Sequence, residues 1–340
     1  ERVEGALIYA DIQVLCGGTT LRLTPDGMAT VDRYWQPHAA PEHLDRDDGY
    51  YIRTYRATIE EAVACRLRRL IHPPSMLFSG GFDSGTIAAL AGPLVAARGW
   101  KLTCLASVLP EHDTRRNARP AVEAFRGRPG LDLRFYVRGD ETTYDDLEAT
   151  FDRTLRPRPP SIVRRRIGEM ARATGSRLIL DGHGGDYTVN AYDQAMLGAI
   201  LRRGEVGRFA REFRARMRFT GWSALRVFGR DVLSAFVPDR IRRPWRWAVN
   251  GFVPAWQRRG VRREFALDAF ARGVVDRLRL RDGYRPGARW RERWTEMCRN
   301  VASDGIGSNY GATTPDLELT RPFHDKRIVE LALALPEQLL

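Results

Sequence analysis

Between residues 75 and 182, short apolar runs alternate with segments of helical character, and this alternation constrains the fold more than any other feature. The expected strands are SMLF, KLTCLASVL, LDLRFYV and SRLILDG, at residues 75–78, 101–109, 131–137 and 176–182. The expected helices cover residues 85–99, 119–128 and 161–175. Strands separated by helices form a parallel sheet with helices on both faces. The predicted fold class is therefore α/β, with a doubly wound parallel sheet.

The segments on either side of this region differ from it. Residues 6–15 and 21–35 are predicted to form strands, the latter with Pro25-Asp26-Gly27 as a turn between two alternating runs. Residues 51–70 have helical spacing, with one apolar face formed by Ile52, Tyr55, Ile59, Ala62, Val63 and Leu67. Beyond about residue 190 the strand pattern stops, and arginine-rich amphipathic segments predict a mostly helical C-terminal region.

Composition argues against several classes of protein. The 340 residues carry a formal net charge of +13, which suits a nucleic-acid partner, but only Lys101 and Lys326 of the 55 basic residues are lysines. Arginine is spread throughout the chain, so a coding bias explains the charge as well as binding does. No stretch reaches the roughly 18 uninterrupted apolar residues of a membrane span, and the N-terminus lacks a signal-peptide layout. We therefore expect a cytoplasmic protein without a nucleic-acid or membrane partner.

The cysteines indicate neither a disulfide framework nor a zinc site. They stand far apart and form no CxxC pair, at Cys16, Cys65, Cys104 and Cys298. We expect them to be buried free thiols.

The first glycine-rich cluster, SGGFDS, follows one expected strand and opens a helix. Gly80 and Gly81 permit a ligand to approach the backbone N–H groups at the helix N-terminus, which favour anions. Ser79 and Ser84 can donate hydrogen bonds to phosphate oxygens. Asp83 would repel a polyphosphate unless a divalent cation lay between them, so the cluster predicts a magnesium nucleotide. It is not the Walker pattern, which needs a lysine and a longer loop.

The second cluster, in LILDGHGGDYTVN, repeats this arrangement after another expected strand. Asp186 is a second candidate ligand for magnesium, and two carboxylates at adjacent strand ends suit a magnesium-bridged pyrophosphate leaving group. His183 lies between glycines and is expected to be exposed, where a histidine can act as an acid or base. One such cluster could be a tight turn whose aspartate caps a helix, but two at strand ends favour nucleotide binding.

SGGFDS resembles the SGGxDS pyrophosphate loop of the N-type ATP pyrophosphatases. The tail DLELTRPFHDKRIVELALALPEQL is similar to a segment of asparagine synthetases: a glutamate, then Pro-Phe-x-Asp, then an amphipathic helix ending in Leu-Pro. DGHGGD lies where that family has its second glycine-aspartate loop, and YWQP near Trp35 resembles its junction between amidotransferase-like and synthetase domains. The resemblance covers nearly the whole chain. It implies an adenine nucleotide alpha hydrolase-like (HUP-type) fold with ATP and Mg2+ as cofactors.

The resemblance also implies roles for particular residues. The residues implied to bind ATP are Leu77, Ser79, Gly80, Gly81, Asp83, Ser84, Gly182 and Gly184. The implied magnesium ligands are Asp83 and Asp186, and the implied catalytic residues are His183, Asp186 and Glu318. Glu318 and Asp325 match the tail motif, but a structural role as a buried salt bridge or helix cap remains open for both. Asp113 falls, more loosely, where the family often has an acidic pair near the substrate.

A domain organisation follows from the same resemblance. Residues 1–40 are expected to be a remnant of the N-terminal amidotransferase-like (Ntn-type) β region, and residues 41–340 the asparagine synthetase-like ATP-pyrophosphatase domain. Within that domain, residues 41–190 would bind the nucleotide and the helical residues 191–340 would bind the substrate. Nothing resembles a complete glutaminase domain, and the sequence stops before the stretch where relatives place a lysine that stabilises the adenylate. Either the chain continues, or another cation replaces that lysine.

Departures from the family pattern bear on the substrate. Asparagine synthetases carry glutamates at the positions of His183 and Tyr187, which argues against asparagine as the product. β-Lactam synthetases have a tyrosine at the His183 position that helps to deprotonate the attacking amine, and a histidine could do the same. The asparagine synthetase-like cyclases that close the macrolactam ring of lasso peptides resemble this chain best. They adenylate a side-chain carboxyl of a precursor peptide, whose own N-terminal amine then attacks.

The function predicted is therefore an ATP-dependent amide-forming ligase that closes a lasso-peptide macrolactam. Its expected partners are a precursor peptide, a leader peptidase and a leader-recognition protein. Three alternatives remain open: a glutamine-hydrolysing asparagine synthase-like or β-lactam synthetase-like small-molecule ligase, a tRNA-modifying ATP pyrophosphatase, and an inactive scaffold. The absence of paired cysteines argues against the thiolating tRNA enzymes.

Overall fold

A computed structural model of residues 1–340 describes residues 15–113, 117–142, 144–145, 147–148, 151, 162–185, 196–233, 236, 262, 264 and 316–336. The chain divides into two compact units. One contains Glu1–Gln36 and Tyr192–Ser303, and the other contains Pro37–Ala191 and Asp304–Leu340.

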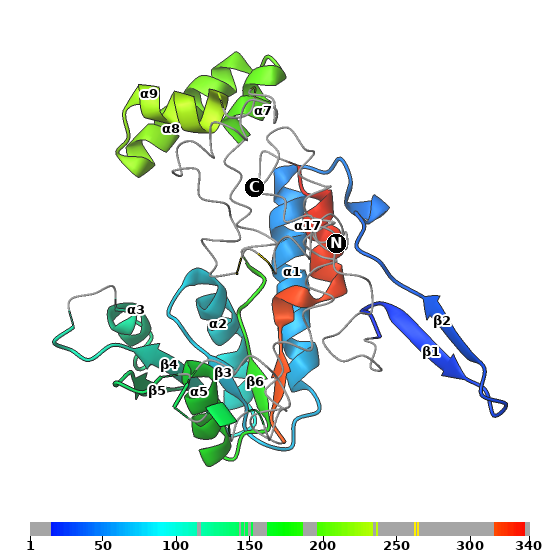
Figure 1. Cartoon of the computed structure of the whole chain (residues 1–340). Coiled ribbons are helices and arrows are strands. Elements are labelled where there is room, and N and C mark those ends of the chain that lie inside the picture. Colours follow the sequence, from blue (N-terminus) through cyan, green and yellow to red (C-terminus); the bar gives the residue numbers. More distant parts are fainter. Residues whose placement is uncertain are drawn as a thin grey trace. The chain divides into compact units, whose positions relative to one another are not determined.

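A parallel sheet with the strand order β5-β4-β3-β6-β7 forms the centre of the second unit (Figure 1). Its strands are β3 (Ser75–Leu77), β4 (Leu102–Val108), β5 (Leu131–Val137), β6 (Leu178–Leu180) and β7 (Glu318–Thr320). The first four confirm the predicted strands. The fifth was not predicted, because three residues carry too little periodicity; pairing of Leu178 with Glu318 and of Leu180 with Thr320 defines it.

Helices cover both faces of this sheet, which confirms the predicted doubly wound α/β fold. They are α1 (Asp48–Leu67), α2 (Phe82–Ala96), α3 (Arg119–Glu123), α5 (Ile162–Ala173) and α17 (Lys326–Ala334). Successive strand residues point to opposite faces. Met76 and Cys104 therefore pack in the core with α1 and α2, whereas Leu105 and Ile179 pack with Ile167 of α5. Helix α2 begins three residues earlier than predicted, and α3 is shorter.

Helix α1 begins after Asp47, whose side chain accepts a hydrogen bond from the Tyr50 N–H at 2.9 Å. Its apolar face is as predicted except at the first turn. Ile52, expected on that face, is 67% exposed, and Tyr51 is buried instead. Tyr51 packs against Leu331 of α17 and donates a hydrogen bond to the His43 carbonyl at 2.7 Å. Contact with α17 therefore decides which side of this turn is buried.

In the first unit, β1 (Thr19–Leu23) and β2 (Ala29–Arg33) form an antiparallel hairpin. The turn lies where Pro25-Asp26-Gly27 predicted it, and Gly27 has a φ of +87°, which favours glycine. The Thr24 N–H closes the turn by donating to the Met28 carbonyl at 3.0 Å. The strand predicted for residues 6–15 lies outside the described residues except for Leu15.

The first unit also contains helices, as predicted for the C-terminal region. They are α7 (Met196–Arg202), α8 (Val206–Thr220), α9 (Ala224–Val227) and the π-helical η2 (Phe228–Leu233). Their shared core includes Leu197, Val227 and Val232. Arg226 and Arg230 place their guanidinium groups over the Trp222 ring, at 4.6 and 4.8 Å from its centroid. At least one tryptophan of this region therefore packs between helices and arginines.

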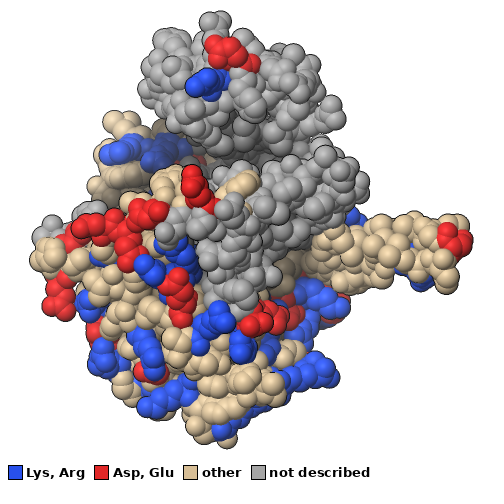
Figure 2. Space-filling model, turned by 60° about the horizontal axis from the view of Figure 1, so that its bottom comes forward, with Lys and Arg blue, Asp and Glu red and all other residues tan. Residues whose placement is uncertain are grey.

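Figure 2 shows basic and acidic side chains interspersed over the described part of one face. Within the described residues, no helix has the length and apolarity to span a membrane.

Burial raises the pKa of the Cys104 thiol to about 12, with a smaller contribution from the Asp132 charge. Cys16 and Cys65 are only half-buried, so the expectation of buried thiols is confirmed for Cys104 and wrong for these two; Cys298 lies outside the described residues.

Candidate functional site

The two glycine-rich clusters follow neighbouring strands at the centre of the sheet. Strand β3 pairs with β4 on one side and with β6 on the other, so the order of strands reverses between β3 and β6. The crossover helix α2 lies on one face and α5 on the other. The carboxyl ends of strands at such a switch point are where doubly wound sheets bind ligands. The topology therefore places SGGFDS and residues 181–185 of the second cluster after two adjacent strands, β3 and β6 (Figure 1).

Hydrogen bonds between hydroxyl groups shape the first loop. The Ser79 and Ser84 Oγ atoms are 3.1 Å apart, and Ser79 Oγ also accepts from the Gly81 N–H at 3.3 Å. Helix α2 starts after Gly81 without a side-chain cap, so the first N–H groups of the helix face the loop. This combination of hydroxyls and helical N–H groups suits the phosphates of a nucleotide.

Gly80 holds the loop against α3. Its φ is +71°, and a Cβ atom at this position would lie 2.6 Å from the Val122 N atom and closer still to the Ala121 carbonyl. Both the backbone conformation and the lack of space therefore require glycine.

The second loop lies directly against the first. A Cβ atom at Gly182 would be 2.9 Å from the Ser84 N atom, and one at Gly185 would overlap the carboxylate of Asp83. The structure therefore brings Asp83, the predicted magnesium ligand, into contact with the loop that contains His183. His183 is exposed, and its N–H donates to Asp181 Oδ1 at 3.0 Å.

The tail segment packs on the other side of the second loop. Arg321 Nε donates to Asp181 Oδ2 at 3.1 Å, and both side chains are nearly buried, at 12% and 13% exposed. The 3-10 helix η4 (Pro322–His324) follows. A Cβ atom at Gly184, where φ is +111°, would be 2.7 Å from His324 Nε2. Sequence reasoning did not single out Arg321 or His324; the RPFHD motif contained both, but only the fold shows what they contact.

Asp325 has a structural role, which was one of the two interpretations left open for it. It caps α17 by accepting from the Arg327 N–H at 3.1 Å, and it also accepts from Arg66 at 3.0 Å. Burial alone would raise its pKa, but the hydrogen bonds from Arg327 and Arg66 outweigh burial and lower the pKa to about 2. This network ties α1 to the start of α17.

Leu77 ends β3 and packs on the α5 face, and Asp113 lies in the turn after β4. Glu318 is exposed and pairs with Leu178, so it stands at the amino end of β7, away from the glycine-rich loops at the carboxyl ends. Its catalytic role stays a prediction. Asp186 and Tyr187 lie outside the described residues.

The donor set at this site suits magnesium held mainly by a nucleotide. The described residues contain no group of three or more His, Cys, Asp or Glu side chains that could hold a metal. Magnesium does not require such a cage, because it commonly binds through one or two carboxylates together with phosphates and water. Asp83, pressed against Gly185 beside the serine hydroxyls, meets that requirement.

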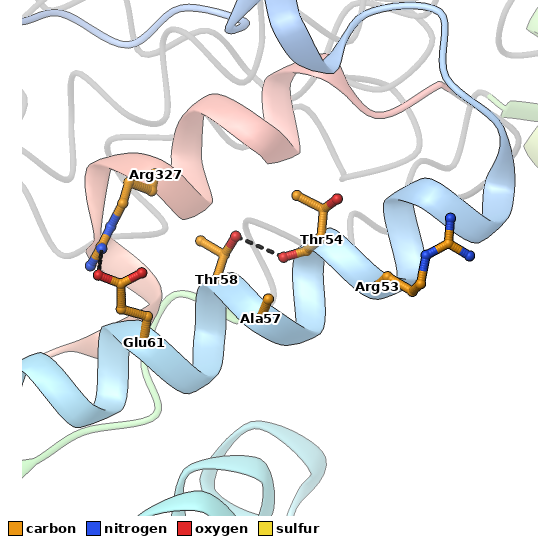
Figure 3. A pocket seen from close by; sticks show the side chains of 6 residues that line it. All are labelled: Arg53, Thr54, Ala57, Thr58, Glu61 and Arg327. Carbon is orange, nitrogen blue, oxygen red and sulfur yellow. Dashed lines mark hydrogen bonds and ion pairs between the residues drawn. The ribbon is translucent and has the colours of Figure 1, made fainter.

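A shallow hollow of about 340 Å³ lies elsewhere, along α1 and the first turn of α17 (Figure 3). It is lined by Arg53, Thr54, Ala57, Thr58, Glu61 and Arg327. Several of its polar groups already interact, since Arg327 pairs with Glu61 at 2.5 Å and the Thr58 hydroxyl donates to the Thr54 carbonyl at 2.7 Å. It contains none of the glycine-rich loops, so it is a separate feature of the surface.

The tail segment predicts two stages of acid destabilisation. Burial, assisted by the nearby Arg321 charge, lowers the pKa of His324 from 6.5 to about 4. The folded state then binds this proton less readily than the unfolded chain, so stability should fall by about 3 kcal/mol as pH drops from 6.5 to 4. Asp325 stabilises the fold above pH 3.8, and this contribution, on the order of 2 kcal/mol, should disappear as pH falls towards 2.

Urea unfolding at a series of pH values checks this expectation. His324→Gln should remove the first stage and leave the second, whereas Asp325→Asn should remove the second. A wild-type free energy of unfolding that stays constant from pH 6.5 to 4 would contradict the burial of a neutral His324.

Comparison with known proteins agrees with the geometry. The family model for asparagine synthase matches residues 54–340, which include both glycine-rich loops and the RPFHD tail. No curated protein matches the chain. Because the match covers most of the sequence and every part of the site described above, the chain belongs to the asparagine synthase family.

Proposed function

We propose that this protein activates a side-chain carboxylate of a peptide with ATP and joins it to the peptide's own N-terminal amine, closing a macrolactam ring of the lasso-peptide type. Family membership supports the coarser part of this function, an ATP-dependent amide-forming ligase that releases AMP and pyrophosphate. The contact between Asp83 and Gly185, which joins the two loops beside an exposed His183, is the observation that carries the proposal.

The first loop would bind the nucleotide. The serine hydroxyls and the N–H groups at the start of α2 would hold phosphate oxygens, and Leu77, Gly182 and Gly184 would line the site at the ends of β3 and β6. Asp83 would hold magnesium, with Asp186 as the second ligand expected from the sequence. When bound, this ion neutralises charge on the departing pyrophosphate.

The reaction would proceed in two steps. A carboxylate oxygen of the peptide attacks the α-phosphorus of ATP, and the bond between that phosphorus and the bridging oxygen of pyrophosphate breaks. The amine nitrogen then attacks the acyl carbon, the amide bond forms and AMP leaves with the carboxylate oxygen. His183 would accept the proton that the amine loses. Holding the amine beside the acyl-adenylate can lower the barrier by about 7 to 11 kcal/mol relative to the untethered reaction.

Two features of the chain favour a peptide over aspartate as the substrate. His183 and Tyr187 replace the two glutamates that asparagine synthetases carry in the second loop. The arginine-rich region of residues 191–340 would form the peptide-binding part, and the described helix α8 alone contains Arg208, Arg211, Arg214, Arg216 and Arg218. Residues 1–40 would be the remnant of an amidotransferase-like region. A leader peptidase would expose the amine, and a leader-recognition protein would deliver the precursor.

The test measures pyrophosphate release and product mass together. Candidate precursor peptides with a free N-terminal amine and an acidic residue inside the future ring should stimulate pyrophosphate release and lose the mass of one water. Peptides whose amine is acetylated should support adenylation at most. His183→Ala should slow ring closure by about 100-fold or more, the usual contribution of a general base.

The same assay decides among the alternatives. Release stimulated by aspartate with ammonia or glutamine would favour an asparagine synthase-like ligase, which the family match also permits. Pyrophosphate release stimulated by tRNA would favour a tRNA-modifying enzyme. A failure to release pyrophosphate with any carboxylate, peptide or tRNA would leave an inactive scaffold and overturn the proposal.

A further inference from the structure

We infer that His324 is a positioning residue that holds the His183 side chain in the orientation needed for proton transfer. The inference rests on the function proposed above, because it gives His183 a proton to accept. It assigns a role to a residue of the tail segment that lies 141 positions further along the chain than His183.

The His324 ring lies directly against the His183 ring. The His183 and His324 rings form an edge-type pair, with centroids 5.8 Å apart and planes at 61°. The His324 ring fills the space that a side chain at residue 184 would need, since a Cβ atom there would lie 2.5 Å from its Cδ2. One ring therefore contacts both His183 and the left-handed residue that follows it.

The backbone of the same turn is held by a second interaction from the same segment. Asp181 accepts one hydrogen bond from the His183 N–H and another from Arg321. Arg321 precedes η4 and His324 ends it. The segment 321–324 therefore fixes the main chain at His183 through a nearly buried ion pair and its side chain through a ring contact.

The environment of His324 indicates that its ring holds the His183 side chain by packing and not by charge. Its Nε2 atom is buried and has no hydrogen-bond partner in the described part of the chain. Burial, with the Arg321 and His183 charges, lowers its pKa to about 4, while Asp181 opposes that shift. Near neutral pH, His183 therefore faces an uncharged ring, which restricts its rotamers without competing for its proton.

Kinetics of five proteins test the inference: wild type, His324→Leu, His324→Phe, His183→Ala and the double variant His183→Ala/His324→Leu. Misplacing a reacting group by about 1 Å can cost roughly 100-fold, so loosening His183 through His324→Leu should lower kcat by about 10-fold and leave KM for ATP unchanged. His324→Phe keeps a flat ring and should retain most of the wild-type kcat.

The double variant separates positioning from a general structural role. If His324 acts through His183, adding His324→Leu to His183→Ala should cause no further loss of kcat. A further loss of about 10-fold would mean that the two contributions are independent, and it would overturn the inference.

A readout that does not depend on activity keeps this test separate from that of the proposed function. The protein has six histidines, so ring C–H signals are few in a ¹H–¹³C NMR spectrum, and the His183 signal is the one that His183→Ala removes. His324→Leu should shift and broaden that signal, whereas the control His72→Leu, at an exposed site, should not. An unmoved His183 signal overturns the inference whatever the activity. A shifted signal in a protein that releases no pyrophosphate overturns the proposed function and with it the role in proton transfer.

Discussion

Replacement of Asp83 by asparagine is expected to slow ATP-dependent pyrophosphate release by about 100- to 1,000-fold. Asparagine keeps the size of the side chain and so preserves the contact with Gly185, but it removes the negative charge expected to hold magnesium. The variant should therefore fold normally and need more magnesium for half its maximal rate. The measurement is pyrophosphate release at saturating ATP, over a range of magnesium concentrations.

A matched control for Asp83 is available at the same edge of the sheet. Asp140 is an exposed carboxylate just after β5, and Asp140→Asn changes the net charge by the same amount. It should leave the rate and the magnesium requirement as in wild type. A similar loss in both variants would mean that overall charge, and not a ligand at the switch point, governs the rate.

Gly80→Ala is expected to have the largest effect on stability, lowering the free energy of unfolding by about 3 kcal/mol. The left-handed conformation costs an alanine about 1 to 2 kcal/mol. The collision with the Ala121 carbonyl adds an overpacking cost of roughly 1 to 3 kcal/mol, because backbone cannot rotate out of the way. Urea unfolding measures the change. Displacement of the loop should also abolish pyrophosphate release, since Ser79 would move with it.

The variant Gly127→Ala measures the conformational cost without the overpacking cost that Gly80→Ala also carries. Its φ is +78°, close to the +71° of Gly80, but nothing lies within 4 Å of its missing Cβ. Gly127→Ala should therefore cost about 1 to 2 kcal/mol, which is the conformational part alone. Equal losses at the two positions would show that the loop can move away from α3, contrary to the close packing described here.

Local patterns were sufficient to predict the elements next to the site. Each strand from β3 to β6 is a short apolar run, and each glycine-rich loop is a cluster of small residues directly after such a run. These signals come from residues that are close together in the sequence, so they can be recognised without knowledge of the tertiary contacts. The hairpin turn at Gly27 was predictable for the same reason.

Contacts between distant segments were not predictable in this way. Strand β7 has only three residues and exists because β6 pairs with it. Tyr51 is buried in place of Ile52 because α17 covers that side of α1. Asp325 matched the family's tail motif, but the sequence left open whether its role was structural, and the hydrogen bonds from Arg66 and the Arg327 N–H show that it pairs with an arginine and caps α17.

By itself, the sequence determined the α/β class, the two phosphate-binding candidates and their shared position at strand ends. Only the tertiary structure decided that Asp83 touches Gly185, that Arg321 pairs with Asp181 and that His324 packs on His183. The physical reason is that strand and loop signals arise from neighbours along the chain. These three contacts instead join residues about 100 to 140 positions apart, and they form only when the sheet places β3, β6 and β7 side by side.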